Sequence, residues 1–136
     1  MQNTCEDLTY IIPSLTKHSN TLIKLYIKEL EAPLSFIAKF TNLQEIVFSY
    51  YYDDSFEDFK ELQYVIFPQL QILKFTRACP RYELLIKFLE NNGKNLKEFY
   101  VKKGNDLLNL AVAKFCPNLI NYLLYLQEMN KIIESE

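Results

Sequence analysis

The hexapeptide Leu22-Ile23-Lys24-Leu25-Tyr26-Ile27 carries apolar residues at its first, fourth and sixth positions. The same L-x-x-L-x-L form, with other apolar residues at its last two fixed positions, returns at 43–48, 70–75, 96–101 and 119–124. The leading leucines are 21, 27, 26 and 23 residues apart, and three of them follow an asparagine. A nearly even period of this length is typical of repeat proteins, whose units stack to bury a shared core. Each hexapeptide therefore predicts one short strand.

Apolar residues between these strands recur three and four residues apart, which is helical spacing. Pro33 stands at the first helical position of one such segment, where its missing N–H is not needed. Another segment ends at the capping signal Asn91-Asn92-Gly93, and the last one stops at Pro117. We expect helices at 34–38, 56–62, 84–89 and 107–115, the last with an apolar stripe of Leu107, Leu108, Ala111, Val112 and Phe115.

The alternation of strands and helices indicates an α/β fold with parallel strands. One such fold is the doubly wound sheet, whose strands are buried on both faces and are nearly continuous apolar runs. Here the third, fifth and seventh positions of each strand frame are often polar, so one sheet face is expected to be buried and the other exposed to water. This pattern favours a solenoid, a curved parallel sheet with helices on its outer side.

The stretch from Asn105 to Leu119 predicts a helix that ends at Cys116-Pro117, just before the next strand. Together with the L-x-x-L-x-L frames, it resembles the cysteine-containing type of leucine-rich repeat, over roughly residues 8–126. This type is found in the F-box/leucine-rich-repeat proteins, the substrate receptors of cullin-type ubiquitin ligases. The resemblance implies a solenoid of about five repeats, with strands on the concave side and helices on the convex side. It also implies a protein partner.

The sequence departs from this family at two points. Family members often have Asn or Cys in the turn after the frame, where this chain has Leu30, Tyr51, Ala78 and Gly104. The region before Asn20 is also too short to hold an F-box, so a link to a cullin-type ligase would need a missing or separate F-box. We expect a single domain over 1–136, with an N-terminal helical segment at 1–17, repeats at 18–126 and a C-terminal helical tail at 127–136.

Composition excludes several classes of function. The chain has 136 residues, 49% of them apolar and 24% charged, which is typical of one globular domain. Its net charge of −2 argues against a nucleic-acid or anionic membrane partner. No apolar run approaches the roughly 18 residues of a membrane span, and no signal peptide is evident.

Few residues are suited to catalysis or to metal binding. The three cysteines, Cys5, Cys79 and Cys116, form no C-x-x-C pair and indicate reduced thiols of an intracellular protein, cytoplasmic or nuclear. His18 is the single histidine, and the two glycines are too far apart for a phosphate-binding loop. We therefore predict no catalytic residue, no cofactor and no metal site.

The concave face is the usual recognition surface of a solenoid. The third, fifth and seventh frame positions are expected there, because side chains alternate along a strand. Aromatic and apolar residues among charges are typical of an interface, although Tyr and Val also favour strands for their own sake. The candidate partner-binding residues are Lys24, Tyr26, Lys28, Glu45, Val47, Lys74, Glu98, Tyr100, Lys102, Asn121, Leu123 and Tyr125.

A second candidate is the loop of Tyr50, Tyr51, Tyr52 and Asp53. Loop tyrosines make rigid, amphipathic contacts at low entropic cost. The alternative, which we favour, is that two of these tyrosines pack beneath the loop. The lysines at 94, 97, 102 and 103 are interpreted as a solvated face, because acidic residues lie among them.

We expect a protein-interaction module that resembles the substrate-recognition repeats of F-box/leucine-rich-repeat receptors. Two alternatives stay open. One is a truncated or fragmentary repeat protein with no independent activity. The other is an enzyme with an unmarked site, which the single histidine and the lack of phosphate-binding loops disfavour.

Overall fold

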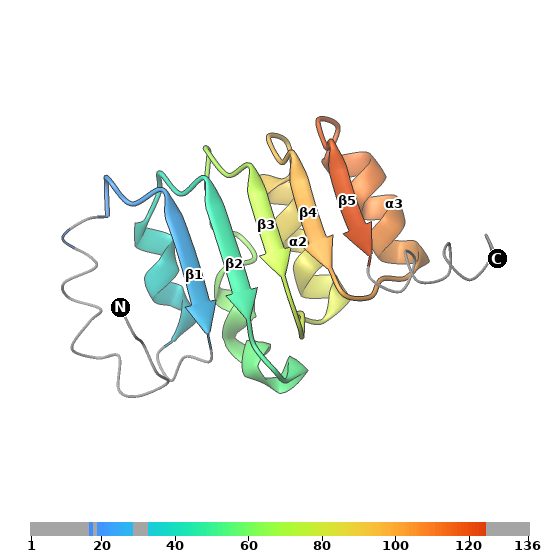
Figure 1. The fold of residues 1–136 in the computed structure, drawn as a ribbon, viewed down its shortest axis with the longest axis horizontal. Helices are drawn as coiled ribbons and strands as arrows, with labels where there is room; N and C mark the ends of the chain where they lie inside the picture. Colours follow the sequence, from blue (N-terminus) through green and yellow to red (C-terminus); the bar gives the residue numbers. More distant parts are fainter. Residues whose placement is uncertain (1–16, 18, 29–32, 125–136) are drawn as a thin grey trace.

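Five parallel strands form one sheet, and their order across the sheet is their order in the sequence (Figure 1). The computed structural model describes residues 17, 19–28 and 33–124, so the helical segments expected at 1–17 and 127–136 lie outside the described residues, apart from residue 17. Each strand begins two residues after the leading leucine of its frame, which confirms the five predicted strands and the α/β class. The strands are β1 (Lys24–Lys28), β2 (Glu45–Ser49), β3 (Ile72–Phe75), β4 (Glu98–Val101) and β5 (Asn121–Leu124).

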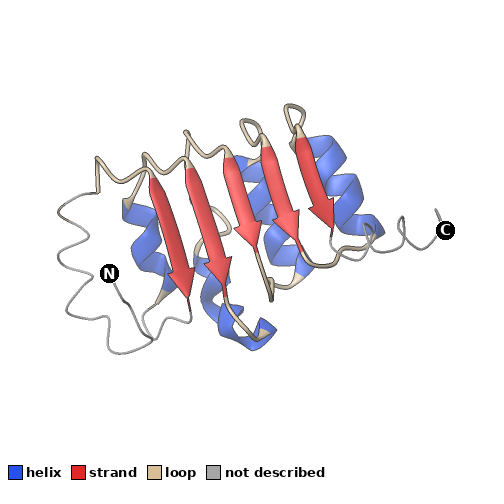
Figure 2. Cartoon of the chain, viewed as in Figure 1, coloured by secondary structure: helices blue, strands red, loops and turns tan. Residues whose placement is uncertain are grey.

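Helices connect the strands, and those of the described residues all lie on one side of the sheet (Figure 2). Each of the four helices predicted between the strands is present, but the first two are 3-10 helices. Pro33 precedes the first of them with extended backbone (φ −62°, ψ 138°), so it is not at the first helical position as predicted. The second is kinked at Phe56, whose φ and ψ are not helical. The helices are η2 (Leu34–Lys39), η3 (Asp53–Glu61), α2 (Tyr82–Asn92) and α3 (Asp106–Phe115).

The core lies between the sheet and its helices and is rich in phenylalanine. Phe48 and Phe75 are paired in register on β2 and β3, and their rings stack 5.0 Å apart. Phe59 from η3 makes edge contacts with both rings. Aromatic pairs of this kind contribute roughly 0.5–1.5 kcal/mol beyond the area that they bury. The leading leucines Leu43, Leu70 and Leu96 are fully buried in the same core.

The last helix differs from the prediction in one respect. Leu108 and Val112 pack into the core, as the apolar stripe of 107–115 predicts, but Leu107 is 66% exposed. The Asn105 side chain caps α3 by accepting a hydrogen bond from the Leu108 N–H at 2.9 Å. With the helix fixed in this phase, Leu107 and Leu110 point to solvent.

Side-chain amides join successive turns at the amino ends of the strands. Asn42, Asn95 and Asn118 each precede a leading leucine. Their Nδ2 atoms donate to the carbonyls of Asn20 (2.6 Å), Pro68 (3.1 Å) and Lys94 (2.8 Å). In every case the acceptor lies two residues before the leading leucine of the preceding strand.

Backbone hydrogen bonds join the same turns in a regular way. At each junction one carbonyl accepts two consecutive N–H groups of the next strand's start. Ile23 accepts from residues 44 and 45, Gln44 from 71 and 72, Gln71 from 97 and 98, and Lys97 from 120 and 121. The four junctions between neighbouring strands therefore have the same backbone connection.

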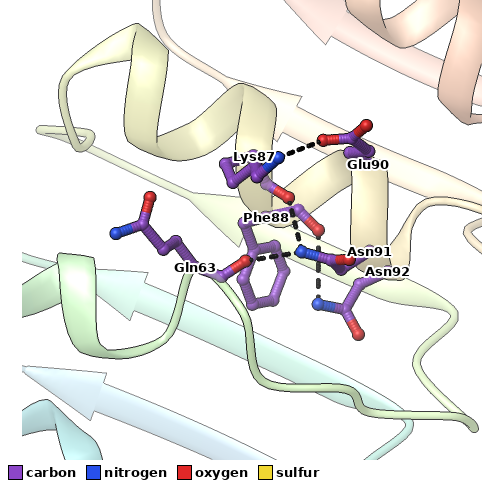
Figure 3. Close-up of polar contacts among 6 residues, drawn as sticks. All are labelled: Gln63, Lys87, Phe88, Glu90, Asn91 and Asn92. Atoms are coloured by element: carbon purple, nitrogen blue, oxygen red, sulfur yellow. Dashed lines mark hydrogen bonds and ion pairs between the residues drawn. The ribbon is translucent and has the colours of Figure 1, made fainter.

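The end of α2 is tied to the segment before β3 by two asparagines (Figure 3). Asn91 donates to the carbonyl of Gln63 at 2.8 Å, and buried Asn92 donates to the carbonyl of Val65 at 2.7 Å. The helix ends at Gly93, as the capping signal predicts. Its φ of −77° is not left-handed, so this glycine is explained by close packing: a Cβ there would lie 2.5 Å from the carbonyl oxygen of Phe115.

Candidate partner-binding surface

One face of the sheet, here called the open face, is covered by no described helix (Figures 1 and 2). The strand register places the candidates of the strands in rows across this face. The strand register places Tyr26 beside Val47, Val47 beside Lys74, and Lys74 beside Tyr100. Tyr100 in turn pairs with Leu123 on β5. This middle row crosses the whole sheet. A second row, nearer the amino ends of the strands, contains Lys24, Glu45, Ile72, Glu98 and Asn121.

The side chains of the middle row differ in accessibility. Tyr26 is 59% exposed, and Tyr100 is half-buried. Val47 is only 7% exposed, because the larger side chains of its neighbours flank it. Ser49, next to Val47 on the same strand face, is also buried. A partner on this face would therefore contact mainly the tyrosines and lysines, while Val47 contributes to the shape beneath them.

Charged residues on the open face are paired loosely. The Lys24 Nζ lies 3.5 Å from a carboxylate oxygen of Glu45 in the neighbouring strand. The Lys28 Nζ lies 5.8 Å from the centre of the Tyr26 ring. Exposed pairs of this kind contribute about 1 kcal/mol or less, so a partner could replace them at little cost.

Two depressions lie on the open face. The first is an open hollow of about 300 Å³ over β3–β5, lined by Lys74, Thr76, Glu98, Phe99, Tyr100 and Asn121. The second, of about 550 Å³, lies toward the carboxyl ends of the strands and is lined by Tyr26, Ser49, Thr76, Arg77, Tyr100 and Lys102. Both contain predicted candidates, and Tyr100 belongs to both. The side chain of Leu123 and all of Tyr125 lie outside what the structure describes.

The tyrosines of the loop candidate differ in their exposure to solvent. Tyr50 is 1% exposed and stacks on Phe56 at 4.6 Å, so it belongs to the core and is not accessible to a partner. Tyr51 and Tyr52 are 61% and 71% exposed. One tyrosine therefore packs beneath the loop, where the favoured alternative expected two. Asp53 accepts a hydrogen bond from the Cys79 backbone N–H at 3.3 Å.

Arg77 and Arg81 lie next to the candidate residues, although no pattern in the sequence points to them. The Arg77 guanidinium lies 4.5 Å from the centre of the Tyr51 ring. Arg81 lines the same depression as Tyr51 and Tyr52, at the carboxyl ends of the strands. Arg77 stands two residues beyond the end of β3, as Tyr51 does beyond β2, and Arg81 directly precedes α2.

The described thiols are held in their protonated form. Burial raises the pKa of Cys116 to about 11. Burial, together with the Asp53 carboxylate, raises the pKa of Cys79 to about 11 against an opposing effect of Lys103. A thiol protonated at neutral pH is a poor nucleophile. Among the described residues, no three His, Cys, Asp or Glu side chains are grouped so as to hold a metal ion, and no helix is long and apolar enough to cross a membrane.

Comparisons with known proteins give no match: neither a protein-family model, nor a curated protein, nor a solved structure is significantly similar to this chain.

Proposed function

We propose that this chain is a protein-interaction module built as a leucine-rich-repeat solenoid, with the open face as its concave, partner-binding side. Three features support the solenoid. The strands follow one another across the sheet in sequence order, the described helices share one side, and at each of the four junctions one carbonyl accepts two consecutive N–H groups. At three of these junctions an asparagine side chain also donates to a carbonyl of the preceding turn.

The observation that carries the interaction role is the middle row of the open face. Tyr26, Lys74 and Tyr100 lie in register across neighbouring strands, on a face that no described helix covers. Tyrosine is enriched among the residues that dominate binding energies, because it offers large apolar area and a polar tip at low entropic cost. Val47, which lies between Tyr26 and Lys74 in this row, is buried.

The proposal extends to a substrate-receptor role in a cullin-type ubiquitin ligase, inside the cell, with the F-box supplied separately. This part rests on the resemblance to the cysteine-containing repeat. Cys116 is buried at the end of α3, and its carbonyl accepts the N–H of Leu119 at 3.3 Å, so the Cys-Pro turn leads directly into β5. The competing proposal is a fragment of a repeat protein with no activity of its own.

The test is affinity purification of the tagged full chain from extracts of its own cells, followed by binding of the purified partner. The Tyr26→Ala/Tyr100→Ala variant should lose the partner, with affinity weakened by about 2 kcal/mol or more, or roughly thirtyfold. A matched control is Tyr64→Ala/Leu107→Ala, which removes similar exposed side chains outside the open face. Both variants must keep the wild-type circular dichroism spectrum.

The outcomes separate the alternatives. A partner that the control retains and the open-face variant loses supports the interaction module. Cullin-ligase subunits among the captured proteins would support the receptor role as well. Equal capture by both folded variants would contradict the placement on the open face, and an empty capture would favour the inactive fragment.

A further inference from the structure

A third depression lies beyond the carboxyl ends of β2, β3 and β4, next to the open face. It has a volume of about 600 Å³, and three loops from successive strands form its walls. Four of its lining residues are cations, and Asp53 is its one acidic residue. The four cations are Arg77, Arg81, Lys102 and Lys103.

The guanidinium of Arg77 lies over the Tyr51 ring, 4.5 Å from the ring centre. A cation–π contact of this kind leaves N–H groups of the guanidinium available for an anion. The second guanidinium, Arg81, lies 3.5 Å from Glu83 in a pair that is largely exposed on both sides. Such a pair is weak, and a ligand with a higher negative charge can displace it.

The start of α2 adds to the positive potential of this depression. Pro80, Arg81 and Tyr82 line it, and they are the residues at which the helix begins. The N-cap residue, Arg81, makes no side-chain capping hydrogen bond. The positive end of the helix dipole and its first N–H groups therefore lie beside the four cations.

Two hydrogen bonds join the three loops and fix the shape of the depression. The Cys79 N–H donates to Asp53 Oδ1 at 3.3 Å, which links the loop after β3 to the loop after β2. The Tyr82 hydroxyl donates to the carbonyl of Lys103 at 2.9 Å, which links the start of α2 to the loop after β4. The Asp53 carboxylate is thereby engaged with the backbone, and the cations are held on a shared framework before any ligand arrives.

We infer that this depression binds the phosphate of a phosphorylated serine or threonine in a protein partner. A phosphorylated side chain brings a charge of about −2 and three acceptor oxygens, which suit paired arginines and lysines. The inference rests on the proposed function in one respect, that the ligand is part of a protein. It assigns a role to Lys103, which the sequence pattern indicates only as part of a solvated face, and a more specific role to Lys102, which is also a predicted partner-binding candidate.

The neighbourhood of the depression favours a phosphopeptide over a nucleic acid. Arg77 and Lys102 also line the second depression of the open face, together with Tyr26 and Tyr100. Residues that flank the phosphate would therefore continue onto the aromatic row. A nucleic acid needs an extended basic track along its backbone, whereas here the cations surround one hollow and the chain carries a net charge of −2.

The test uses a short probe, so that it does not depend on the open face. Binding of the acetylated, amidated tripeptide Ala-phosphoserine-Ala to the full-length chain is followed by NMR chemical-shift titration. The Arg77→Gln/Lys102→Gln variant should bind at least about tenfold more weakly, because two charge-assisted contacts are lost. Lys94→Gln/Lys97→Gln removes the same charge at the amino ends of the strands and should leave the affinity unchanged.

Several results would overturn the inference. One is equal binding of the Ala-Ser-Ala or Ala-Glu-Ala tripeptide, which would show that phosphate is not recognised. Another is equally weakened binding in Arg77→Gln/Lys102→Gln and Lys94→Gln/Lys97→Gln, which would show that the affinity depends only on the net charge of the chain. Displacement of the phosphopeptide by a short single-stranded oligonucleotide at lower concentration would assign the depression to nucleic acid. A tripeptide that fails to bind while the open-face partner still binds would contradict this inference alone.

Discussion

Asn92, the last residue of α2, accepts a hydrogen bond from the backbone N–H of Phe67 through its Oδ1 atom at 2.7 Å. Its Nδ2 atom donates to the carbonyl of Val65 at 2.7 Å and to that of Phe88 at 3.2 Å. Figure 3 shows the contact of Asn92 with Phe88. One buried amide side chain thus satisfies three backbone groups, two of them 25 and 27 residues earlier in the sequence. This contact holds the end of one helix against the segment that leads into the preceding strand.

Replacement of Asn92 by Leu should destabilise the fold by about 2–4 kcal/mol, because it leaves the buried N–H of Phe67 and the partly buried carbonyl of Val65 without this partner. Urea denaturation monitored by circular dichroism measures the loss. The matched control is Asn95→Leu, whose amide makes an exposed contact with Pro68 and should cost about 1 kcal/mol or less. Equal decreases of the free energy of unfolding in the two variants would show that the buried amide contributes no more to stability than the exposed one.

Gly93→Ala should also destabilise the chain, through packing rather than backbone conformation. A Cβ at this position would lie 2.5 Å from the carbonyl oxygen of Phe115 and 2.8 Å from the Sγ of Cys116. The end of α3 would have to move away from α2, at a cost of about 1–3 kcal/mol. Gly104→Ala is the control, since neither described glycine has a positive φ. A thermal unfolding midpoint of Gly93→Ala equal to that of Gly104→Ala would contradict the close packing.

The sequence predicts the open-face rows well, because the alternation of side chains along a strand is a local property. Once the frames are aligned, Tyr26, Val47, Lys74 and Tyr100 must share a face. The accessibility of Val47 is a different matter, since it depends on how large the neighbouring side chains are and how they lean across the sheet. The same limit applies to Tyr50, whose burial is decided by its contact with Phe56.

The third depression, which four cations line, could not be predicted from the sequence for a related reason. Arg77 and Lys102 are 25 positions apart, and no local pattern connects them. They come together because β3 and β4 are neighbours in register and end at the same side of the sheet. The asparagines before the leading leucines were visible as a pattern, but the pattern does not say which carbonyl each of them reaches.

The described thiols should resist alkylation in the folded protein. The pKa of Cys79 and that of Cys116 are both raised to about 11, so at pH 8 each is almost entirely protonated. Because burial favours the neutral thiol, its contribution to stability is fully present below the unfolded pKa of about 8.5 and is lost as the pH rises through 11. Iodoacetamide labelling at pH 8, mapped by mass spectrometry, should be slow at both sites and fast after unfolding in guanidinium.

One variant separates the causes at the two thiols. Asp53→Asn removes a negative charge near Cys79, so the pKa of Cys79 should fall and its labelling should become faster. Cys116 has burial as its cause and should not respond, which makes it an internal control. Faster labelling of both thiols would instead indicate that the variant loosens the fold as a whole.

A single substitution should stabilise the chain by completing the asparagine contacts at the amino ends of the strands. Gln69 stands where Asn42, Asn95 and Asn118 stand in their own turns, directly before a leading leucine. By the same spacing, an asparagine at 69 would donate to the carbonyl of Thr41, two residues before Leu43. We expect Gln69→Asn to raise the free energy of unfolding by about 0.5–1 kcal/mol, the value of one additional hydrogen bond.

The control for this variant is Gln44→Asn, which makes the same chemical change at an exposed position after a leading leucine. It shortens a side chain without placing an amide opposite the earlier turn, so its stability should stay within about 0.5 kcal/mol of wild type. Urea midpoints measured side by side decide the matter. If Gln69→Asn is no more stable than Gln44→Asn, the three asparagine contacts are local features of their own turns and are not transferable to the turn before Leu70.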